Sequence, residues 1–408
     1  MKRVVITGVG VISSLGDDWN TFKGNLLAGV NGVAYMPDWE RLKDLNTRLG
    51  APVPHFKIPD YPRKKTRSMG RVSLMATRAT EVALCDAGLI DNPVLSSGQT
   101  GVAYGSSTGS TDAVRDFTNM LINGNMHGIT ATTYIRMMGH TTAVNIGIFF
   151  SLKGRIINTS TACTSGSQGI GTAFELIKSG KQTVMIAGGA EELCPSEAVV
   201  FDTLYATSTM NQQPHLTPRP FDRDRDGLVI GEGAGTLILE ELEHARARGA
   251  TIYCELVGYG TNSDGTHVTQ PTAETMQVAM ELALQDAGLD QAAIGYINAH
   301  GTATDRGDIA ESHATATLFG TKVPISTLKG NLGHTMGACG SLESWASINM
   351  MNEDWFAPTL NLDNVDEACA ELDYIMHEPR KLNCEYIMSN NFAFGGINTS
   401  LIYKRWVD

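Results

Sequence analysis

One cysteine of this chain, Cys163, stands in a sequence setting that favours nucleophilic chemistry. The β-branched residues Ile156 and Ile157 precede it, and a helical pattern carrying Phe174 and Ile177 follows it. A thiol at the start of a helix lies beside free backbone N–H groups and the positive end of the helix dipole, and both favour the nucleophilic thiolate. The alternative is a small buried hydrophobic residue, which is what most cysteines are. Three glycines in the helix (Gly166, Gly169 and Gly171) predict close packing against another backbone.

Two histidines occupy similar places further along the chain. His300 closes a predicted strand in Asn298-Ala-His-Gly-Thr-Ala-Thr304, and His334 ends Lys329-Gly-Asn-Leu-Gly-His334. A single histidine is more often structural, but two on equivalent loops that face a thiol indicate a catalytic site. Lys329 is expected to oppose protonation of both imidazoles.

A turn near the end of the sequence, Phe392-Ala-Phe394-Gly-Gly396, would present backbone N–H groups to an oxyanion.

An internal repeat predicts the architecture that brings these residues together. Residues 83–89 read Ala-Leu-Cys-Asp-Ala-Gly-Leu and residues 283–289 read Ala-Leu-Gln-Asp-Ala-Gly-Leu, and each closes a helical pattern. The order strand, helix, strand, small-residue helix recurs in both parts. We therefore predict an α/β fold of two βαβ-type halves, 1–250 and 251–408, with an insertion at about 106–154. The two small-residue helices would lie between sheets, packed against each other.

Composition narrows the function classes. At 408 residues the chain exceeds the ~250–300 that one hydrophobic core usually supports. A net charge of −12 argues against nucleic-acid binding through bulk charge. The seven cysteines are scattered and contain no C-x-x-C pair, which indicates free thiols, a reducing cytoplasmic location and no metal site. No apolar run reaches the ~18 residues of a spanning helix, so no membrane association is expected.

Three motifs fail as functional signatures. Gly8-Val-Gly10 follows a strand but lacks the third glycine of a dinucleotide fingerprint. Asp222-Arg-Asp-Arg-Asp-Gly227 lacks the glutamate that completes a calcium loop, so internal Asp–Arg pairing in a surface turn is expected. Glu191 and Glu192 are adjacent on a strand end and point apart, so a structural use is expected.

Taken together, the motifs resemble those of the β-ketoacyl-acyl-carrier-protein synthases, in the elongating type I/II branch of the thiolase-fold group. The resemblance covers essentially the whole chain. The matching stretches are Thr161-Ala-Cys163, Gly188-Gly-Ala-Glu-Glu192, Pro220–Gly227 with Gly231-Glu-Gly-Ala234, Asn298–Thr302, Lys329–His334 and Ser389–Gly396.

The resemblance implies a thiolase-like five-layer α-β-α-β-α fold and a decarboxylative Claisen condensation. An acyl group would move from a carrier-protein phosphopantetheine to Cys163, and malonyl-carrier protein would extend it by two carbons, with no separate cofactor. The implied roles are these: Cys163 as nucleophile, His300 and His334 as donors to the enolate, Lys329 with Glu343 as support, Phe394 as oxyanion donor and gate beside Phe392, Thr302 and Thr304 on pantetheine, and Phe201 and Thr108 on the acyl pocket.

Acyl carrier proteins are acidic, so an enzyme of net charge −12 needs a local basic patch to bind them. The expected patch is Arg63, Lys64, Lys65, Arg67 and Arg71. The resemblance also implies a homodimer, with a heterodimer containing a related ketosynthase subunit as the alternative.

Several positions depart from the family pattern around the expected pocket. Asp305-Arg306 stands where Pro-Leu is usual, Gly-Asn-Leu follows Lys329, Ile397 replaces a threonine, and Thr108 replaces a larger aliphatic residue. These departures suggest a specialised acyl chain, for example a polyunsaturated or aryl-primed one. A non-catalytic partner subunit and a degradative thiolase-like enzyme remain as alternative functions.

Overall fold

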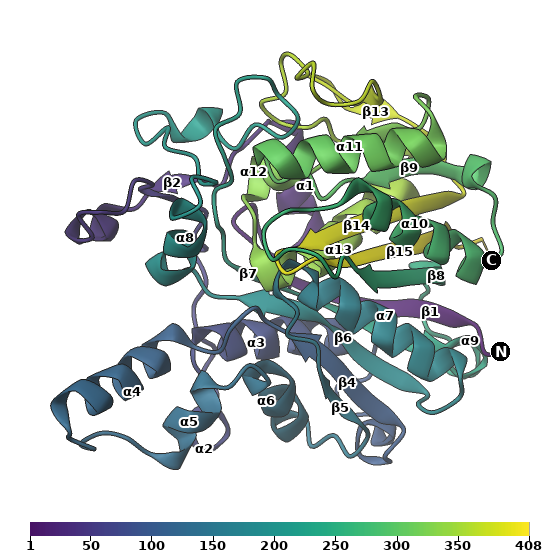
Figure 1. Cartoon of the computed structure of the whole chain (residues 1–408). Helices are drawn as coiled ribbons and strands as arrows, with labels where there is room; N and C mark the ends of the chain where they lie inside the picture. Colours follow the sequence, from purple (N-terminus) through teal and green to yellow (C-terminus); the bar gives the residue numbers. More distant parts are fainter. Residues whose placement is uncertain (408) are drawn as a thin grey trace.

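The strand order of the main sheet mirrors the internal repeat of the sequence. The computed structural model describes residues 1–407 and contains an 11-stranded sheet (Figure 1). The first half contributes, from the edge inward, β5 (Ile156–Asn158), β4 (Thr100–Gly105), β6 (Val184–Glu191), β7 (Gly233–Glu241) and β1 (Val4–Ile12). The second half contributes, from the centre outward, β8 (Cys254–Ser263), β15 (Ile397–Arg405), β14 (Tyr386–Ala393), β9 (Ile294–Asn298), β10 (Pro324–Ser326) and β12 (Asp373–Tyr374).

The two half-sheets meet where the start of β1 pairs antiparallel with the start of β8. The predicted join near residue 250 falls in the loop between α9 (Leu242–Ala247) and β8.

The helices and the two half-sheets form five layers, as predicted. α3 (Arg71–Asp86) and α6 (Thr141–Phe149) pack on the outer face of the first half-sheet. α10 (Ala273–Ala287) packs on the second half-sheet, and α11 (Asp305–Phe319) packs against α10. α7 (Ser165–Lys178) and α13 (Cys339–Asn352) lie between the half-sheets and contact each other (Figure 1). α7 and α13 therefore form the central layer of the fold. α7 begins two residues after Cys163, and α13 begins five residues after His334.

The Gly-x-Gly motifs of β1 and β8 serve helix packing. A Cβ atom added at Gly8 would lie 2.4 Å from the carbonyl oxygen of Ala83, and one at Gly258 would lie 2.4 Å from that of Ala283. Neither contact tolerates a side chain, so α3 and α10 approach their strands at backbone distance. The sequence motif that resembled a dinucleotide fingerprint is thus a repeated packing feature.

The glycines of α7 have more than one packing partner. A Cβ at Gly166 would lie 3.0 Å from the backbone nitrogen of Ser341 in α13, which confirms close approach of the two central helices. Gly169 instead faces strand backbone, and Gly171 faces the ring of Tyr259. The predicted close packing against another backbone is therefore confirmed for Gly166 and Gly169, whereas Gly171 packs against a side chain; only Gly166 contacts the other central helix.

The predicted insertion consists of three helices with different surroundings. α4 (Thr111–Asn123) and α5 (Ala131–Met137) extend away from the layered body (Figure 1), whereas α6 belongs to the outer helical layer. The remaining elements are α1 (Trp19–Leu27), α2 (Arg63–Thr66), α8 (Pro195–Asp202), α12 (Lys329–Leu332), β2 (Ala34–Tyr35), β3 (Leu49–Gly50), β11 (Trp355–Phe356) and β13 (Arg380–Lys381). Within residues 1–407, no helix combines the length and apolar character needed to span a membrane.

Candidate active site

Cys163 lies where the sequence pattern predicted, between a strand and a helix. β5 ends at Asn158, a 3₁₀ turn covers Ala162–Thr164, and α7 begins at Ser165. Ala162 adopts φ of 53°, a left-handed conformation that turns the chain sharply before the cysteine. The Cys163 side chain is buried at the inner end of a cavity.

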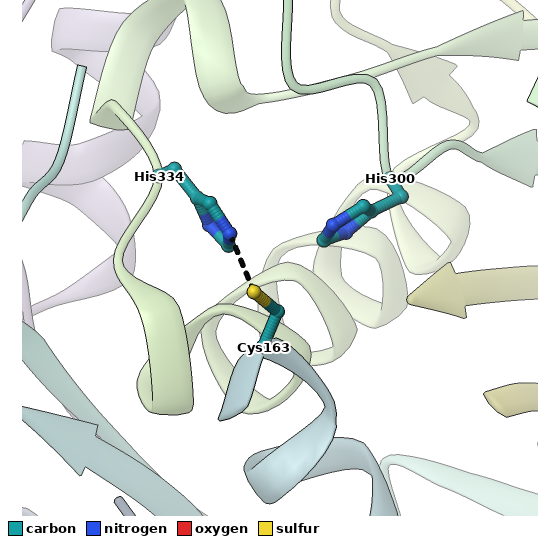
Figure 2. Close-up of side chains that lie close together, drawn as sticks. All are labelled: Cys163, His300 and His334. Carbon is teal, nitrogen blue, oxygen red and sulfur yellow. Dashed lines mark hydrogen bonds between the residues drawn. The ribbon is translucent and has the colours of Figure 1, made fainter. Parts of the chain in front are cut away.

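Both histidines reach Cys163 from the second half of the chain. Figure 2 shows the His334 ring pointing at the thiol, with Nε2 3.0 Å from Sγ. The centroids of the His300 and His334 rings are 5.2 Å apart and the rings are nearly perpendicular. His300 follows β9, and His334 follows the short helix α12. The predicted convergence of these three side chains is therefore present in the structure.

Lys329 connects His300 to a buried acid. Its ammonium lies 2.5 Å from Glu343 Oε1 and donates to His300 Nδ1 at 3.2 Å. Asn391 Nδ2 donates to Glu343 Oε2 at 2.8 Å and lies 3.3 Å from the same His300 nitrogen. All four side chains are buried. The polar groups of this cluster thus hold one another in fixed positions.

These contacts determine which ring nitrogen of each histidine carries the proton. An ammonium can only donate, so Nδ1 of His300 accepts and the ring proton lies on Nε2. The backbone N–H of Met336 likewise points at Nδ1 of His334, at 3.4 Å. Both imidazoles therefore present an Nε2–H donor, and that of His334 faces Cys163.

The histidines are neutral in this environment. Burial, followed by the positive charge of Lys329, lowers the pKa of both His300 and His334 well below the ordinary value for histidine. The predicted effect of Lys329 on the imidazoles is confirmed. The site thus offers two neutral N–H donors, with no imidazolium required at neutral pH.

The expectation that the pKa of Cys163 is lowered, and that its resting form is a thiolate, is wrong. Burial raises the pKa of Cys163 to about 11, and this outweighs the lowering by the backbone N–H groups of Phe394 and Cys163 and by Lys329. Reasoning from the helix start alone omitted the desolvation of a buried anion. The resting group is a neutral thiol, and the same N–H groups are available to stabilise negative charge when it develops.

A buried ion-pair network holds the loop that carries His300. Glu311 accepts hydrogen bonds from the backbone N–H groups of His300 and Gly301, both at 2.7 Å. Asp308 accepts from the backbone of Thr302 and Ala303.

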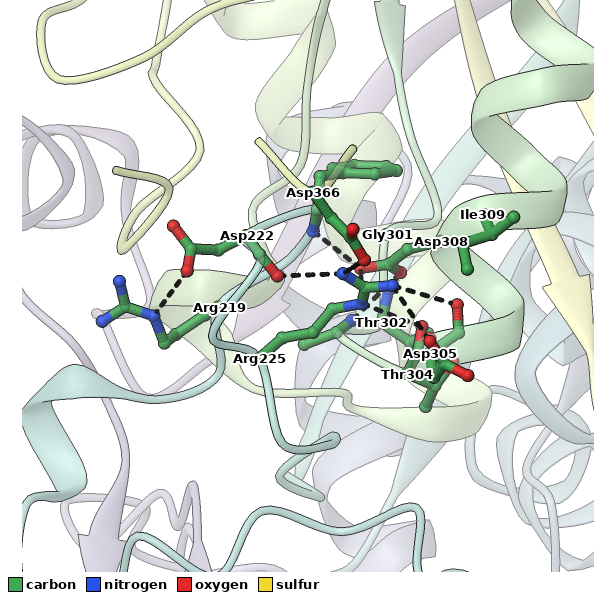
Figure 3. Close-up of polar contacts among 12 residues, drawn as sticks. Arg219, Asp222, Arg225, Gly301, Thr302, Thr304, Asp305, Asp308, Ile309 and Asp366 are labelled. Carbon is green, nitrogen blue, oxygen red and sulfur yellow. Dashed lines mark hydrogen bonds and ion pairs between the residues drawn. The ribbon is translucent and has the colours of Figure 1, made fainter. Parts of the chain in front are cut away.

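Arg225 binds this loop to the first half of the chain (Figure 3). Its guanidinium lies 3.7 Å from Asp308 and 2.6 Å from Asp366, and its side chain is only 3% exposed. The expectation that residues 222–227 form a surface turn with internal pairing is therefore wrong for Arg225. Asp222 is also buried and accepts from the backbone of Asp363 and Asn364.

Two cavities meet at a pair of phenylalanines. The first, of about 450 Å³, is lined by Cys163, both histidines, Thr302, Thr304 and Phe392. The second, of about 700 Å³, is lined by Thr108 and by residues of α4 and α8. Phe201 and Phe394 line both cavities, and their rings meet edge to face with centroids 5.8 Å apart. The residues expected on pantetheine and those expected on the acyl chain thus lie on opposite sides of this aromatic pair.

The predicted basic patch is only partly available to a partner. Arg71 forms a two-pronged ion pair with Glu232, and Lys65 donates to the carbonyl oxygen of Phe149. Arg63, Lys64, Lys65 and Arg67 are exposed and form no ion pair with any residue among 1–407. Of the five cations of the predicted patch, only Arg71 has its charge balanced by an acid.

The sulfur and imidazole nitrogens of the site lie within 4.8 Å of one another, a spacing that metal ligands also show. The nearby ammonium of Lys329 opposes binding of a further cation. This electrostatic argument favours the catalytic assignment over a metal site.

Sequence reasoning missed several residues of the site. Asn391 contacts the ring of His300, which lies 91 residues earlier in the sequence. Glu311 accepts a hydrogen bond from the backbone of His300, which lies 11 residues earlier. Glu191 and Glu192 were expected to be structural, and Glu192 does accept hydrogen bonds from Ser110 and Thr111. Glu197 carried no sequence signal at all.

The layers and the site together define a class: a duplicated α/β enzyme with a buried thiol facing two neutral imidazoles. Residues 1–245 match the β-ketoacyl synthase N-terminal domain and residues 253–363 match the C-terminal domain. The 3-oxoacyl-[acyl-carrier-protein] synthase 2 of Vibrio cholerae is 38% identical, over 99% of this chain and 99% of that protein. The chain belongs to the β-ketoacyl synthase family.

Solved structures agree with this family and with the thiolase-like fold. A β-ketoacyl synthase from Burkholderia phymatum superposes with a TM-score of 0.99 at 62% identity, and the match covers all of both chains. The ishigamide ketosynthase/chain length factor structure gives a TM-score of 0.90 at 31% identity, again over all of both chains.

Proposed function

We propose that this protein is a 3-oxoacyl-[acyl-carrier-protein] synthase in which Cys163 is the nucleophile and His300 and His334 stabilise the enolate. One observation carries the proposal: two neutral imidazoles direct Nε2–H donors to the space in front of one buried thiol. Neutral donors suit a reaction in which negative charge develops on a thioester oxygen, because they stabilise the anion without protonating it in the ground state.

The first step is acyl transfer. Sulfur of Cys163 attacks the thioester carbonyl of an acyl chain on carrier-protein phosphopantetheine, the pantetheine sulfur leaves, and the thiol proton passes to it. The backbone N–H groups of Cys163 and Phe394 would hold the oxyanion of the tetrahedral intermediate. Thr302 and Thr304 would bind the pantetheine arm in the first cavity.

The second step is decarboxylation and condensation. Malonyl-carrier protein loses CO₂, and the electrons of the broken C–C bond form an enolate whose oxygen accepts from His300 and His334. The enolate carbon attacks the acyl thioester on Cys163, the C–S bond breaks, and the sulfur leaves as a thiolate that takes up one proton from solvent. With that proton the step balances and involves no change that requires an oxidant or reductant, so the proposed reaction needs no separate cofactor.

Lys329 acts as a positioning residue in this scheme. It fixes the tautomer of His300 and keeps both imidazoles neutral, while Glu343 balances its charge. Phe394 and Phe201 would gate the passage between the pantetheine cavity and the acyl cavity, with Phe392 on the wall.

Carrier proteins would bind through exposed cations, of which Arg63, Lys64, Lys65 and Arg67 are the available set. Arg71 contributes less because Glu232 balances its charge. The protein is proposed to act as a homodimer; the chain-length-factor relative makes a heterodimer the alternative to test by mass measurement of the assembled protein.

The substrate is proposed to be a specialised acyl chain. Thr108 lines the second cavity, whose exposed wall is mainly apolar and includes Val114, Val200 and Phe201. We expect this chain to be aryl-primed or polyunsaturated. Comparing the turnover of such chains with that of saturated chains of equal length tests this expectation.

Intact mass spectrometry after incubation with acyl-carrier protein tests the function. We expect one acyl adduct on Cys163 and, after malonyl-carrier protein is added, its loss with formation of CO₂ and a 3-oxoacyl product. Cys163→Ser should show no thioester adduct. An unmodified wild-type enzyme would indicate a non-catalytic partner subunit, and condensation without malonyl decarboxylation would indicate a thiolase-like enzyme.

A further inference from the structure

Two adjacent asparagines on β14 point to opposite faces of the sheet, and only one of them reaches the histidines. Successive side chains of a strand alternate between the two faces. Asn390 contacts Met280 of α10 on the outer face, whereas Asn391 contacts Glu343 of α13 in the central layer. Both asparagine side chains are fully buried. The fold thus places one amide at the reacting centre and an identical one away from it.

The contacts of Asn391 determine how its amide is oriented. Nδ2 lies 2.8 Å from Oε2 of Glu343 and 3.3 Å from Nδ1 of His300. A flipped amide would place its oxygen against the carboxylate oxygen, and two acceptors repel each other. The nitrogen therefore faces both groups, and its two hydrogens allow it to donate to each.

Nδ1 of His300 has a second donor, the ammonium of Lys329 at 3.2 Å. That ammonium also lies 2.5 Å from Oε1 of Glu343, a charge-assisted contact that competes for it. The amide of Asn391 is neutral and is carried by a central strand, so its position does not depend on an ion pair. Neither donor can accept a hydrogen bond from the ring through the nitrogen that faces it.

We propose that Asn391 is a positioning residue for His300: its amide N–H keeps Nδ1 an acceptor and so holds the ring proton on Nε2. The inference rests on the proposed decarboxylation and adds a residue to it. With its proton on Nδ1, a neutral ring would turn a lone pair toward the enolate oxygen and repel it. Asn391 acts through the ring and has no contact with substrate in this scheme.

The variant Asn391→Asp tests this role because it keeps the shape and replaces the donor with an acceptor. The new carboxylate would accept from Nδ1–H of His300, so a neutral ring would lose its proton on Nε2. We expect malonyl decarboxylation at pH 8 to fall by about a hundredfold, as for a lost oxyanion donor. Acylation of Cys163 should be retained, because backbone groups hold the oxyanion of that step. Released CO₂ and adduct mass are measured on one sample.

The pH profile separates this loss from general damage to the site. The carboxylate of Asn391→Asp favours the charged ring and raises the pKa of His300. As the pH falls from 8 to 6, the ring gains a second proton and Nε2–H returns, so decarboxylation should recover relative to the wild type. The other titratable groups around the ring are the same in both proteins: Lys329, His334, Glu343 and Cys163.

Two further variants assign the effect to the amide. Asn391→Leu removes the donor without adding an acceptor and leaves Lys329 in place, so decarboxylation should fall by about fivefold with the wild-type pH profile. Asn390→Asp makes the same chemical change on the face turned toward α10 and is the matched control. It should keep the wild-type ratio of decarboxylation to acylation at every pH. Circular dichroism verifies that each variant is folded.

A spectroscopic measurement on the resting enzyme requires no turnover. ¹⁵N NMR of protein labelled at histidine reports which ring nitrogen carries the proton, and His300→Gln assigns the signal. We expect protonated Nε2 in the wild type and protonated Nδ1 in Asn391→Asp.

The outcomes separate the two proposals. The same protonated nitrogen in both proteins, or decarboxylation and acylation that fall together at every pH, would overturn the role of Asn391. If Asn391→Asp does not fold, an unchanged decarboxylation rate in Asn391→Leu would overturn it. A wild-type enzyme that forms no adduct and releases no CO₂ would instead contradict the proposed function, and the NMR measurement would still decide the role of Asn391.

Discussion

Two buried carboxyl groups lie near the nucleophile, and they are treated in opposite ways. Glu343 is paired with Lys329 and Asn391, so both of its oxygens have partners. Glu197 has no ion-pair partner among residues 1–407 and hydrogen-bonds instead to a second carboxyl group, that of Glu191. The first arrangement, on the connected side of the site, fixes the histidines that perform chemistry common to all substrates. The second, on the open side toward the second cavity, is a pair of carboxyl groups without a compensating cation. The comparison shows two ways to bury a carboxyl group: a cation balances its charge at the reacting centre, whereas protonation removes it beside the cavity.

The largest effect is expected on the fully connected side. His300→Ala removes one of the two Nε2–H donors to the enolate, and a lost donor of this kind costs roughly 10²–10³ in rate. We expect malonyl decarboxylation to fall by that factor while acylation of Cys163 is retained, because the oxyanion donors of the first step are backbone groups. Release of CO₂ and adduct mass, measured on the same sample, check the split. Equal loss of both steps would show that His300 serves the whole site and not the enolate.

Lys329 tests whether Glu343 depends on its partner. Lys329→Met leaves an uncompensated buried carboxyl group and should lower the free energy of unfolding by about 3–5 kcal/mol. The double variant Lys329→Met with Glu343→Leu removes both charges and should recover most of that loss, without recovering activity. Denaturant unfolding of the three proteins gives the values. If single and double variants are equally stable, the pair is not coupled as described.

The thiol provides a third test of the connected site. With its pKa at about 11, Cys163 is a neutral thiol at pH 7, and the thiolate fraction rises tenfold for each pH unit up to that value. The rate of alkylation by iodoacetamide should therefore climb steadily from pH 7 to pH 10. Peptide mapping isolates the signal of Cys163 from the other cysteines. A plateau below pH 8 would mean that the helix start and the backbone N–H groups outweigh burial after all.

The sequence predicted more of the connected side than of the open side. Local motifs were enough to predict the duplicated halves and the strand–turn–helix around Cys163. They also predicted that His300 and His334 approach this cysteine. Glu343 was reached through the family resemblance. The buried contact of Glu197 with Glu191 could not be found, because the burial of a carboxyl group depends on everything packed around it and leaves no pattern in the chain.

The direction in which the fold shifts the pKa of Cys163 also could not be predicted from the sequence. The helix start that lowers it is local and visible, whereas the burial that raises it depends on α13 and β14, which come from the other half. The same reason explains Arg225, whose acidic partners Asp308 and Asp366 lie 83 and 141 residues away. Charges that pair across the two halves look like a solvated turn when only neighbours in the sequence are considered.

The smallest effect is expected on stability at the open side. A carboxyl group whose pKa is raised in the folded protein favours folding below its unfolded pKa of about 4.3 and loses that contribution as pH rises toward its folded pKa. Glu197→Gln cannot titrate, so its melting temperature should exceed that of the wild type by a margin that grows between pH 5 and pH 8. The margin at pH 8 should be a few degrees, as expected for about 1–2 kcal/mol in a chain of this size. Matched thermal scans of Glu243→Gln, an exposed carboxyl on α9, supply the control and should show no such trend. A margin that is constant with pH would mean that the folded protein does not raise the pKa of Glu197, and the contrast with Glu343 would then disappear.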